Sequence, residues 1–197
     1  MTRAEGAAIR RMGPAGSVTW SAMLDGAEDI LREEGYAALT SRRIAERIGV
    51  KQRLVYYYFR TMDDLIVETF RRLSVRELER LSAALESERP LREIWDVCIH
   101  TSDARLVSEF MALANRIDGL RTEVIRFIRE ERRMQVTALS AALKRTSWSG
   151  SIPPAGLAIL AKSIALTLNR EGEIGVKTGH AEIMTVIDEF LAAMEPD

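Results

Sequence analysis

Apolar residues recur at helical spacing along most of this 197-residue chain, and this repeat limits the possible folds more than any other feature. From residue 19 onward they return every three or four positions, which is the period of an amphipathic α-helix. The alternating pattern of a half-buried β-strand does not appear over any convincing length. We therefore predict an all-α fold, with an N-terminal three-helix domain followed by a larger C-terminal helical domain.

Two short helices joined by a tight turn are predicted between residues 40 and 60. Thr40 or Ser41 can cap the first of them, because either side chain can accept a hydrogen bond from a free backbone N–H. Gly49 stops this helix, and the next one begins near Lys51. This arrangement is typical of a helix-turn-helix motif.

Longer amphipathic stretches lie on either side of the motif. Thr19 or Ser21 can cap a helix before it, and Thr61 can cap a long helix after it, which Pro90 ends. The further predicted helices cover about 91–100, 103–116, 120–146, 153–171 and 180–194. The expected organisation is a basic tail over 1–18, a helix-turn-helix domain over 19–65 and a helical domain over 66–197.

The composition favours a soluble protein of the cytoplasm. The single cysteine, Cys98, excludes an internal disulfide and therefore a secreted disulfide framework. The N-terminus lacks the apolar stretch of a signal peptide, and no apolar run reaches the roughly 18 residues that a membrane span needs. We expect a cytoplasmic chain with no membrane partner.

Positive charge is concentrated in one short window of a chain whose net charge is −1. Residues 40–60 contain six cations and one anion, Glu46, for a local charge of +5. These cations are Arg42, Arg43, Arg47, Lys51, Arg53 and Arg60. Three arginines and one glutamate give residues 1–18 a charge of +2. A basic patch on an acidic body attracts a polyanion in one orientation, and one hypothesis is that the N-terminal arginines reach into a DNA minor groove.

The second helix of the motif offers side chains of the kind that read a DNA duplex. Its first turn contains Lys51, Gln52 and Arg53; Lys and Arg can donate to guanine, and Gln can pair with adenine. The three tyrosines at positions 56–58 cannot all be buried, because successive side chains on a helix point about 100° apart. The predicted DNA-binding surface consists of Thr40, Arg42, Lys51, Gln52, Arg53, Tyr56, Tyr57 and Tyr58. The alternative is that these cations are ordinary solvated charges.

A run of separated anchor residues extends across the helix-turn-helix region without a gap. The anchors are Met23-Leu24-Asp25-Gly26-Ala27, Gly35-Tyr36, Leu39-Thr40, Ile44-Ala45, Ile48-Gly49-Val50, Val55-Tyr56-Tyr57-Tyr58-Phe59 and Leu65. This run of roughly 45 residues resembles the DNA-binding domain of the TetR family of bacterial regulators. The resemblance implies an all-α dimer with a three-helix DNA-binding head and a C-terminal body that binds a ligand and dimerises.

The resemblance also implies roles for individual residues. It places Thr40, Tyr56 and Tyr58 at phosphates. It places near base edges the residues Lys51, Gln52, Arg53 and Tyr57. Two positions depart from the family pattern, since Arg53 stands where a small residue is common and Met62 where a lysine is usual. Arg60 is a neighbouring cation that can replace the phosphate contact of that lysine.

The last two predicted helices carry apolar residues on more than one face, with Ile159 and Val186 outside the main stripes. A helix that is apolar on two faces is buried on two faces, and in a chain of this length the second face is expected to meet another subunit. The predicted homodimer interface contains Leu157, Leu160, Ile164, Leu168, Ile183, Ile187 and Leu191. The alternative is a core formed wholly within one chain.

The middle helices are predicted to hold a small-molecule effector. The candidate ligand-binding residues are Trp95, Cys98, Phe110, Met111, Asn115 and Phe127. Their side chains predict a mostly apolar effector. The alternative is that they belong to the core, as Met and aromatic residues at helical spacing commonly do.

Catalysis is not expected from this sequence. It has two histidines, His100 and His180, and Cys98 lies about 200° from His100 around a helix, which is unsuitable for a nucleophile and its base. No glycine-rich phosphate loop and no set of metal ligands appears, so we expect no cofactor and no metal. The sequence predicts an effector-responsive repressor that binds double-stranded DNA; the alternative is a helical ligand-binding or adaptor protein that does not read DNA.

Overall fold

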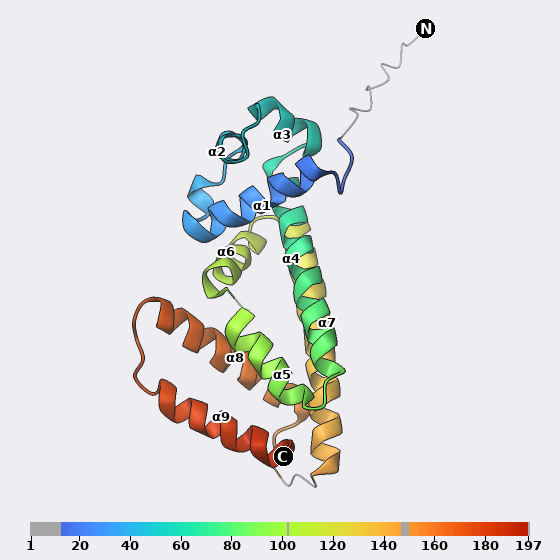
Figure 1. Cartoon of the computed structure of the whole chain (residues 1–197), viewed down its shortest axis with the longest axis vertical. Coiled ribbons are helices and arrows are strands. Elements are labelled where there is room, and N and C mark those ends of the chain that lie inside the picture. The colour runs from blue at the N-terminus through green and yellow to red at the C-terminus, as the bar shows by residue number, and fades with distance from the viewer. Residues whose placement is uncertain (1–12, 102, 147–149, 197) are drawn as a thin grey trace. The chain divides into compact units, whose positions relative to one another are not determined.

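The computed structural model describes residues 13–101, 103–146 and 150–196, and all of its regular elements in these ranges are helical (Figure 1). The helices are α1 (Val18–Glu33), α2 (Ser41–Arg47), α3 (Gln52–Tyr58), α4 (Met62–Leu85), α5 (Pro90–Asp96), α6 (Ala104–Ala114), α7 (Asp118–Arg145), α8 (Pro154–Glu173) and α9 (His180–Met194). A 3₁₀ turn, η1 (Tyr36–Ala38), follows α1, and a π-helical segment, η2 (Val97–Thr101), follows α5. The prediction of an all-α fold is confirmed.

The chain divides into two compact units, Met1–Thr69 and Phe70–Asp197, which we call the N-terminal and C-terminal units. Helix α4 begins in the first unit and ends in the second. The division lies four residues beyond the boundary expected after Leu65. A continuous helix crosses it, so no glycine- or proline-rich linker marks the boundary in the sequence.

The N-terminal unit is built around the apolar face of α1. Five residues of that face have no solvent exposure: Met23, Leu24, Ala27, Ile30 and Leu31. The side chains of Ile44, Val55, Phe59 and Leu65, from the following elements, are buried in the same unit. The ring of Trp20 stacks at a centroid distance of 6.3 Å on that of Phe59. Helix α3 packs against the unit through Val55 and Phe59, so the opposite side of this short helix is exposed to the solvent.

Local capping explains where the helices of this unit begin. Thr40 caps α2 by accepting a hydrogen bond from the backbone N–H of Arg43 at 3.1 Å, as predicted. Thr61 and Asp64 exchange side-chain and backbone hydrogen bonds before α4, and the prediction of Thr61 as a cap is confirmed. The predicted caps of α1, Thr19 and Ser21, are wrong. Ser17 has that role, because its extended backbone lets its hydroxyl accept from the N–H of Trp20 at 3.2 Å.

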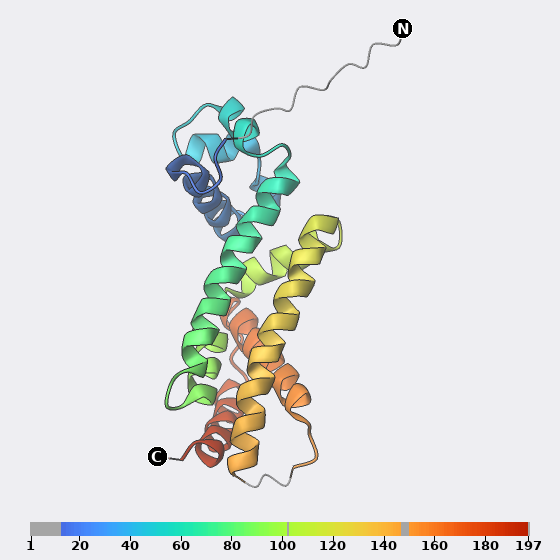
Figure 2. The ribbon, with the colours of Figure 1, turned by 90° about the vertical axis from the view of Figure 1, so that its right-hand side faces the viewer.

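Figure 2 shows the C-terminal unit from a second side, and its core receives residues from α4, α5, α7, α8 and α9. The core contains Leu81, Leu91, Ile94, Trp95, Cys98, Met134, Leu139, Ala142, Ala158, Ala165, Leu168, Leu191 and Met194, among others. In this unit α4 and α7 lie along one side, and α8 and α9 lie along the other (Figure 1). None of the helices in the described ranges is both long and apolar enough to span a membrane.

The predicted dimer residues lie mainly toward this core. Leu168 and Leu191 are buried in it, and the remaining stripe residues pack against it half-buried: Leu157, Ile164, Ile183 and Ile187. The most regular apolar stripe of each helix thus packs at least partly within its own chain, and the role of these residues in a dimer stays a prediction. Leu160 is 48% exposed, and the off-stripe residues Ile159 and Val186 are 50% and 55% exposed.

A carboxylate from the end of the chain caps α5. Pro90 is the first residue of α5, and Arg89 before it makes no side-chain cap. Glu195, buried beyond the end of α9, accepts hydrogen bonds from the backbone N–H groups of Leu91 at 2.8 Å and Arg92 at 3.1 Å. The contact therefore satisfies two N–H groups that a helix start leaves free and holds the two helix ends together.

Replacing Glu195 by alanine should destabilise the C-terminal unit by about 2 kcal/mol, because two buried N–H groups lose a charged acceptor. Glu195→Gln keeps one acceptor oxygen and should lose less. The free energy of unfolding, from urea titrations followed by circular dichroism, measures both effects. Glu189→Ala, at an exposed position of α9, is the matched control. Equal stability of the Glu195→Ala and Glu189→Ala variants would contradict the capping role.

Candidate nucleic-acid interface

The first turn of α3 presents polar side chains to the solvent. Lys51 is the N-cap residue of α3, and Lys51, Gln52 and Arg53 are all exposed. Val55 and Phe59 hold the helix to the unit from its buried side. The sequence prediction of an exposed, basic first turn therefore agrees with the placement of these residues.

A chain of hydrogen bonds connects α2 to α3. The side-chain amide of Gln52 donates to the Ser41 hydroxyl at 2.9 Å, and that hydroxyl donates to the Tyr56 hydroxyl at 3.1 Å. The hydroxyl proton of Tyr56 remains available to a phosphate oxygen. Gln52, which was expected near a base edge, braces the two helices in this structure. It keeps a second N–H and its carbonyl oxygen for an adenine.

The other two tyrosines differ in their surroundings. The ring of Tyr57 is exposed and lies edge-on to that of Tyr58 at a centroid distance of 5.3 Å. Tyr58 is half-buried, and its hydroxyl accepts a long hydrogen bond, 3.4 Å, from Ser17. Tyr58 therefore faces the start of α1, whereas Tyr56 and Tyr57 offer more of their surface to a ligand of α3.

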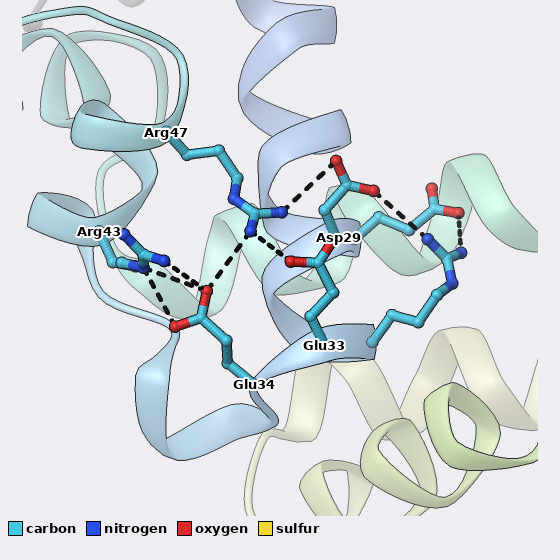
Figure 3. Close-up of polar contacts among 7 residues, drawn as sticks. Asp29, Glu33, Glu34, Arg43 and Arg47 are labelled. Atoms are coloured by element: carbon cyan, nitrogen blue, oxygen red, sulfur yellow. Dashed lines mark hydrogen bonds and ion pairs between the residues drawn. The ribbon is translucent and has the colours of Figure 1, made fainter. Parts of the chain in front are cut away.

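Ion pairs between α1 and α2 occupy two of the six cations in the basic window (Figure 3). The Arg43 guanidinium contacts Glu34 at 2.8 Å. Arg47 contacts Glu33, and it lies 3.7 Å from Asp29 and 3.5 Å from Glu34. The hydrogen bond from Arg47 lowers the pKa of Glu33, and the hydrogen bond from Arg43 lowers that of Glu34, so both carboxylates stay ionised at neutral pH.

The charge of +5 counted in the sequence therefore overstates the available charge. Arg42, 80% exposed, pairs with Glu46 one turn along α2 at 2.8 Å, an exposed contact that costs little to exchange for a phosphate. Lys51, Arg53 and Arg60 have no ion-pair partner within the described ranges. These three cations lie at the start of α3 and directly after it. The first turn of α3 thus offers donors suited to base edges, and Thr40 and Tyr56 offer donors suited to phosphates.

The predicted effector residues have three kinds of surroundings. Phe110 and Phe127 meet Phe70 in an aromatic cluster, with centroid distances of 5.2 Å and 5.9 Å to the Phe70 ring. Trp95 and Cys98 lie in the larger core of the C-terminal unit. The remaining two, Met111 and Asn115, are exposed. Helical spacing alone could not show which of these side chains would share a surface.

A groove of about 790 Å³ runs between α4 and α7 in the C-terminal unit. Its lining residues are Ser74, Val75, Leu78, Thr122, Ile125, Arg126, Phe127, Arg129, Glu130 and Arg133. Only Phe127 among them was predicted to meet an effector. The charged residues of this stretch differ in sign along the sequence, and such a pattern does not show that a second helix stands opposite.

A second polar group is buried deeper in the C-terminal unit. The Lys162 ammonium lies 2.7 Å from Glu131, and the side-chain amide of Gln135 lies 3.8 Å from the Cys98 sulfur. Burial raises the pKa of the Cys98 thiol to about 11, so the thiol is protonated at neutral pH and is a poor nucleophile. No group of three or more His, Cys, Asp or Glu side chains in the described ranges could hold a metal ion.

Comparison with known proteins identifies the region around the helix-turn-helix. Residues 23–69 match the family model described as bacterial regulatory proteins, tetR family. No curated protein matches the sequence.

Solved structures share the whole fold at low sequence identity. A TetR transcription regulator from Haloarcula marismortui is 18% identical, with a TM-score of 0.72 over 89% of this chain and 97% of its own. The reduced form of NemR from E. coli is 17% identical, with a TM-score of 0.72 over 87% and 96%. A protein from Saccharomonospora viridis, solved in complex with choline, is 14% identical, with a TM-score of 0.73 over 81% and 88%. The family match assigns residues 23–69 to the tetR family of bacterial regulatory proteins, and the solved structures show that the chain shares the fold of TetR transcription regulators.

Proposed function

We propose that the chain is a sequence-specific repressor of the cytoplasm that binds its operator as a homodimer and is released by a small, mostly apolar effector. The observation that carries the proposal is that some cations of the N-terminal unit are bound in ion pairs whereas others are exposed without one in the described ranges. Helix α1 neutralises Arg43 and Arg47, whereas Lys51 and Arg53 stand exposed at the first turn of α3. Cations left exposed on a short surface helix suit a major groove.

The roles of the individual residues follow from their chemistry. Lys51 and Arg53 donate to base edges, with Gln52 as a further reader. Thr40 and Tyr56 hold the phosphates on either side, together with Arg42 once it leaves Glu46, and Tyr57 lies near the base edges. Arg60 takes the place of the lysine that the family commonly has at position 62. A protein that works in this way binds DNA and an effector and performs no catalysis.

The proposed dimer forms through the outer faces of α8 and α9. Ile159, Leu160 and Val186 are apolar and about half exposed in one chain, and together they give these helices a surface that association would bury. Two helices from each of two copies would then form a four-helix interface about a two-fold axis. A two-fold dimer reads an operator with two related half-sites.

The groove between α4 and α7 is the proposed effector site. Apolar side chains, among them Val75, Leu78 and Phe127, suit an apolar ligand, and the S. viridis protein of the same fold was solved with the small molecule choline. Helix α4 lines the groove and also enters the N-terminal unit. A ligand with unequal affinity for two positions of α4 would change the affinity for DNA by that difference. A regulator bound over a promoter blocks the polymerase, which favours repression.

Selection of bound duplexes from a random pool should yield a two-fold symmetric sequence. Lys51→Ala and Arg53→Ala should each weaken binding to it by roughly 1–3 kcal/mol and relax the preference at one position of each half-site. Arg121→Ala, at an exposed position of α7, is the matched control and should bind as the unchanged protein does. Fluorescence anisotropy on labelled duplexes measures the affinities. Failure to select any sequence would support the adaptor function instead.

Charge placed on the outer face of α8 or α9 should separate the dimer. Leu160→Glu and Val186→Glu should each give a monomer in sedimentation experiments, because association would bury an unpaired carboxylate. Met111→Glu introduces the same charge at a similarly exposed apolar residue of α6 and should leave the dimer intact. Dimers of unchanged stability in both test variants would contradict the interface.

Filling the groove should abolish the response to effector without affecting DNA binding. Val75 is 52% exposed at the groove, so Val75→Trp can place an indole there without disturbing the core. Compounds that release the unchanged protein from its selected duplex should release this variant poorly. Ile128→Trp, on α7 but outside the groove lining, is the control. An equal response of the two variants would place the effector elsewhere.

A further inference from the structure

The groove between α4 and α7 combines apolar surface with positive charge. Its most exposed apolar side chains come one from each helix: Val75 is 52% exposed and Ile125 is 41% exposed. Leu78 and Phe127 line the same groove and are half-buried. A ligand with an apolar chain would cover this surface and remove it from water, which is favourable.

Three arginines of α7 line the groove beside this surface, and they are Arg126, Arg129 and Arg133. They follow one another at intervals of three and four residues, so they lie on one side of the helix. Unlike the N-terminal arginines expected at a minor groove, which lie outside the described residues, these three are placed by a regular helix. Neighbours in this row are separated by about 4.5–6 Å along the helix axis, so one ligand can meet two of them.

Arg129 is the arginine of this row whose charge is free. It is exposed, and it has no ion-pair partner in the described ranges. Arg133, by contrast, donates to Glu130, with 3.0 Å between the Nε and Oε2 atoms. That hydrogen bond lowers the pKa of Glu130, so the carboxylate stays ionised at neutral pH and neutralises Arg133. An anion that enters the groove would therefore find its first partner in Arg129.

Arg126 keeps part of its charge because its partner is shared. It contacts Glu123 within α7, and the same carboxylate binds Arg71 of α4 at 2.7 Å. One negative charge thus serves two guanidinium groups. Among the residues that line the groove, three are cations and one, Glu130, is an anion, in a chain whose net charge is −1. The groove therefore has an excess of positive charge.

The hydroxyl groups that line the groove are occupied within their own helices. The Ser74 hydroxyl donates to the carbonyl of Arg71 at 2.9 Å. The Thr122 hydroxyl donates to the carbonyl of Asp118 at 3.1 Å. Neither proton is then available to a ligand. The donors that remain among the lining side chains are guanidinium groups, which bind carboxylates through paired, charge-assisted hydrogen bonds.

We propose that the effector of this groove is an amphiphilic anion, a free alkyl carboxylate whose head group binds Arg129 and whose chain covers the apolar surface. The proposal rests on the proposed function, in which the groove is the effector site, and it adds the class of ligand. The volume of about 790 Å³ is within the range of small-molecule sites. A cation such as the choline of the S. viridis complex would be repelled here by the excess positive charge.

Isothermal titration calorimetry with three decyl compounds, each below its micelle concentration, tests the head group. Decanoate should bind about tenfold more tightly than decanol, because a hydrogen bond to a charged group contributes at least that factor. Decyltrimethylammonium should not bind measurably. Added salt should narrow the difference between decanoate and decanol, because an exposed ion pair is screened.

Variants of the groove separate the head group from the chain. Arg129→Gln should lower the affinity for decanoate to that for decanol and leave the affinity for decanol unchanged. Arg129→Lys keeps the charge without the paired donors and should keep part of the preference. Arg121→Gln, which removes an exposed arginine of α7 outside the groove lining, is the matched control. Val75→Trp should weaken decanoate and decanol alike, because the indole occupies the place of the chain.

Calorimetry uses the protein without DNA, which keeps a wrong ligand class distinguishable from a wrong DNA-binding function. Absence of decanoate binding, equal affinity for decanoate and decanol, or unchanged decanoate binding in Arg129→Gln would overturn the proposal. On the selected duplex, decanoate should release the unchanged protein, and Arg129→Gln should need about ten times more of it. Decanoate that binds as expected but releases no DNA would support the ligand class and overturn the effector role of the groove. Loss of duplex affinity in Arg129→Gln without ligand would assign this arginine to DNA and overturn the proposal.

Discussion

Ion pairs between α1 and α2 determine which cations of the N-terminal unit can meet DNA. Asp29, Glu33 and Glu34 form an acidic end of α1, to which Arg43 and Arg47 of α2 are bound. These exposed pairs add little stability individually, but they orient α2 against α1 and remove two charges from the surface. The cations that remain without partners in the described ranges, Lys51, Arg53 and Arg60, lie on or next to α3. The binding surface therefore depends as much on which charges are neutralised as on which are present.

In the C-terminal unit, some apolar residues pack into the core and others are exposed at the surface. The regular stripes of α8 and α9 supply the core of the chain, and the less regular positions, such as Ile159 and Val186, are left exposed. The same division holds between α4 and α7, where one side of each helix is packed and Val75 and Ile125 line an open groove. Helices that are apolar beyond a single stripe thus provide both a packed unit and the surfaces on which we propose dimerisation and effector binding.

The sequence was most informative where structure is set by neighbouring residues. Thr40 and Thr61 were predictable as caps because a capping hydroxyl bonds within three residues of its own position. The contacts that sequence reasoning missed join distant segments: Glu195 with the start of α5, Arg47 with α1, and Gly13 with Tyr57. Periodicity likewise marks an apolar stripe without showing what covers it, and for this reason the groove between α4 and α7 was overlooked.

The dependence of DNA affinity on salt tests the account of the charges most directly. Each phosphate neutralised on B-DNA contributes about −0.9 to the slope of log K against log salt concentration. Replacing Lys51, Arg53 and Arg60 together by alanine should make the slope measured on any duplex clearly less steep, because all three are free to contact DNA. Replacing Arg43 alone should leave it unchanged, because its charge is already neutralised by Glu34. An unchanged slope in the first variant, or an equal reduction per charge in both, would contradict the account.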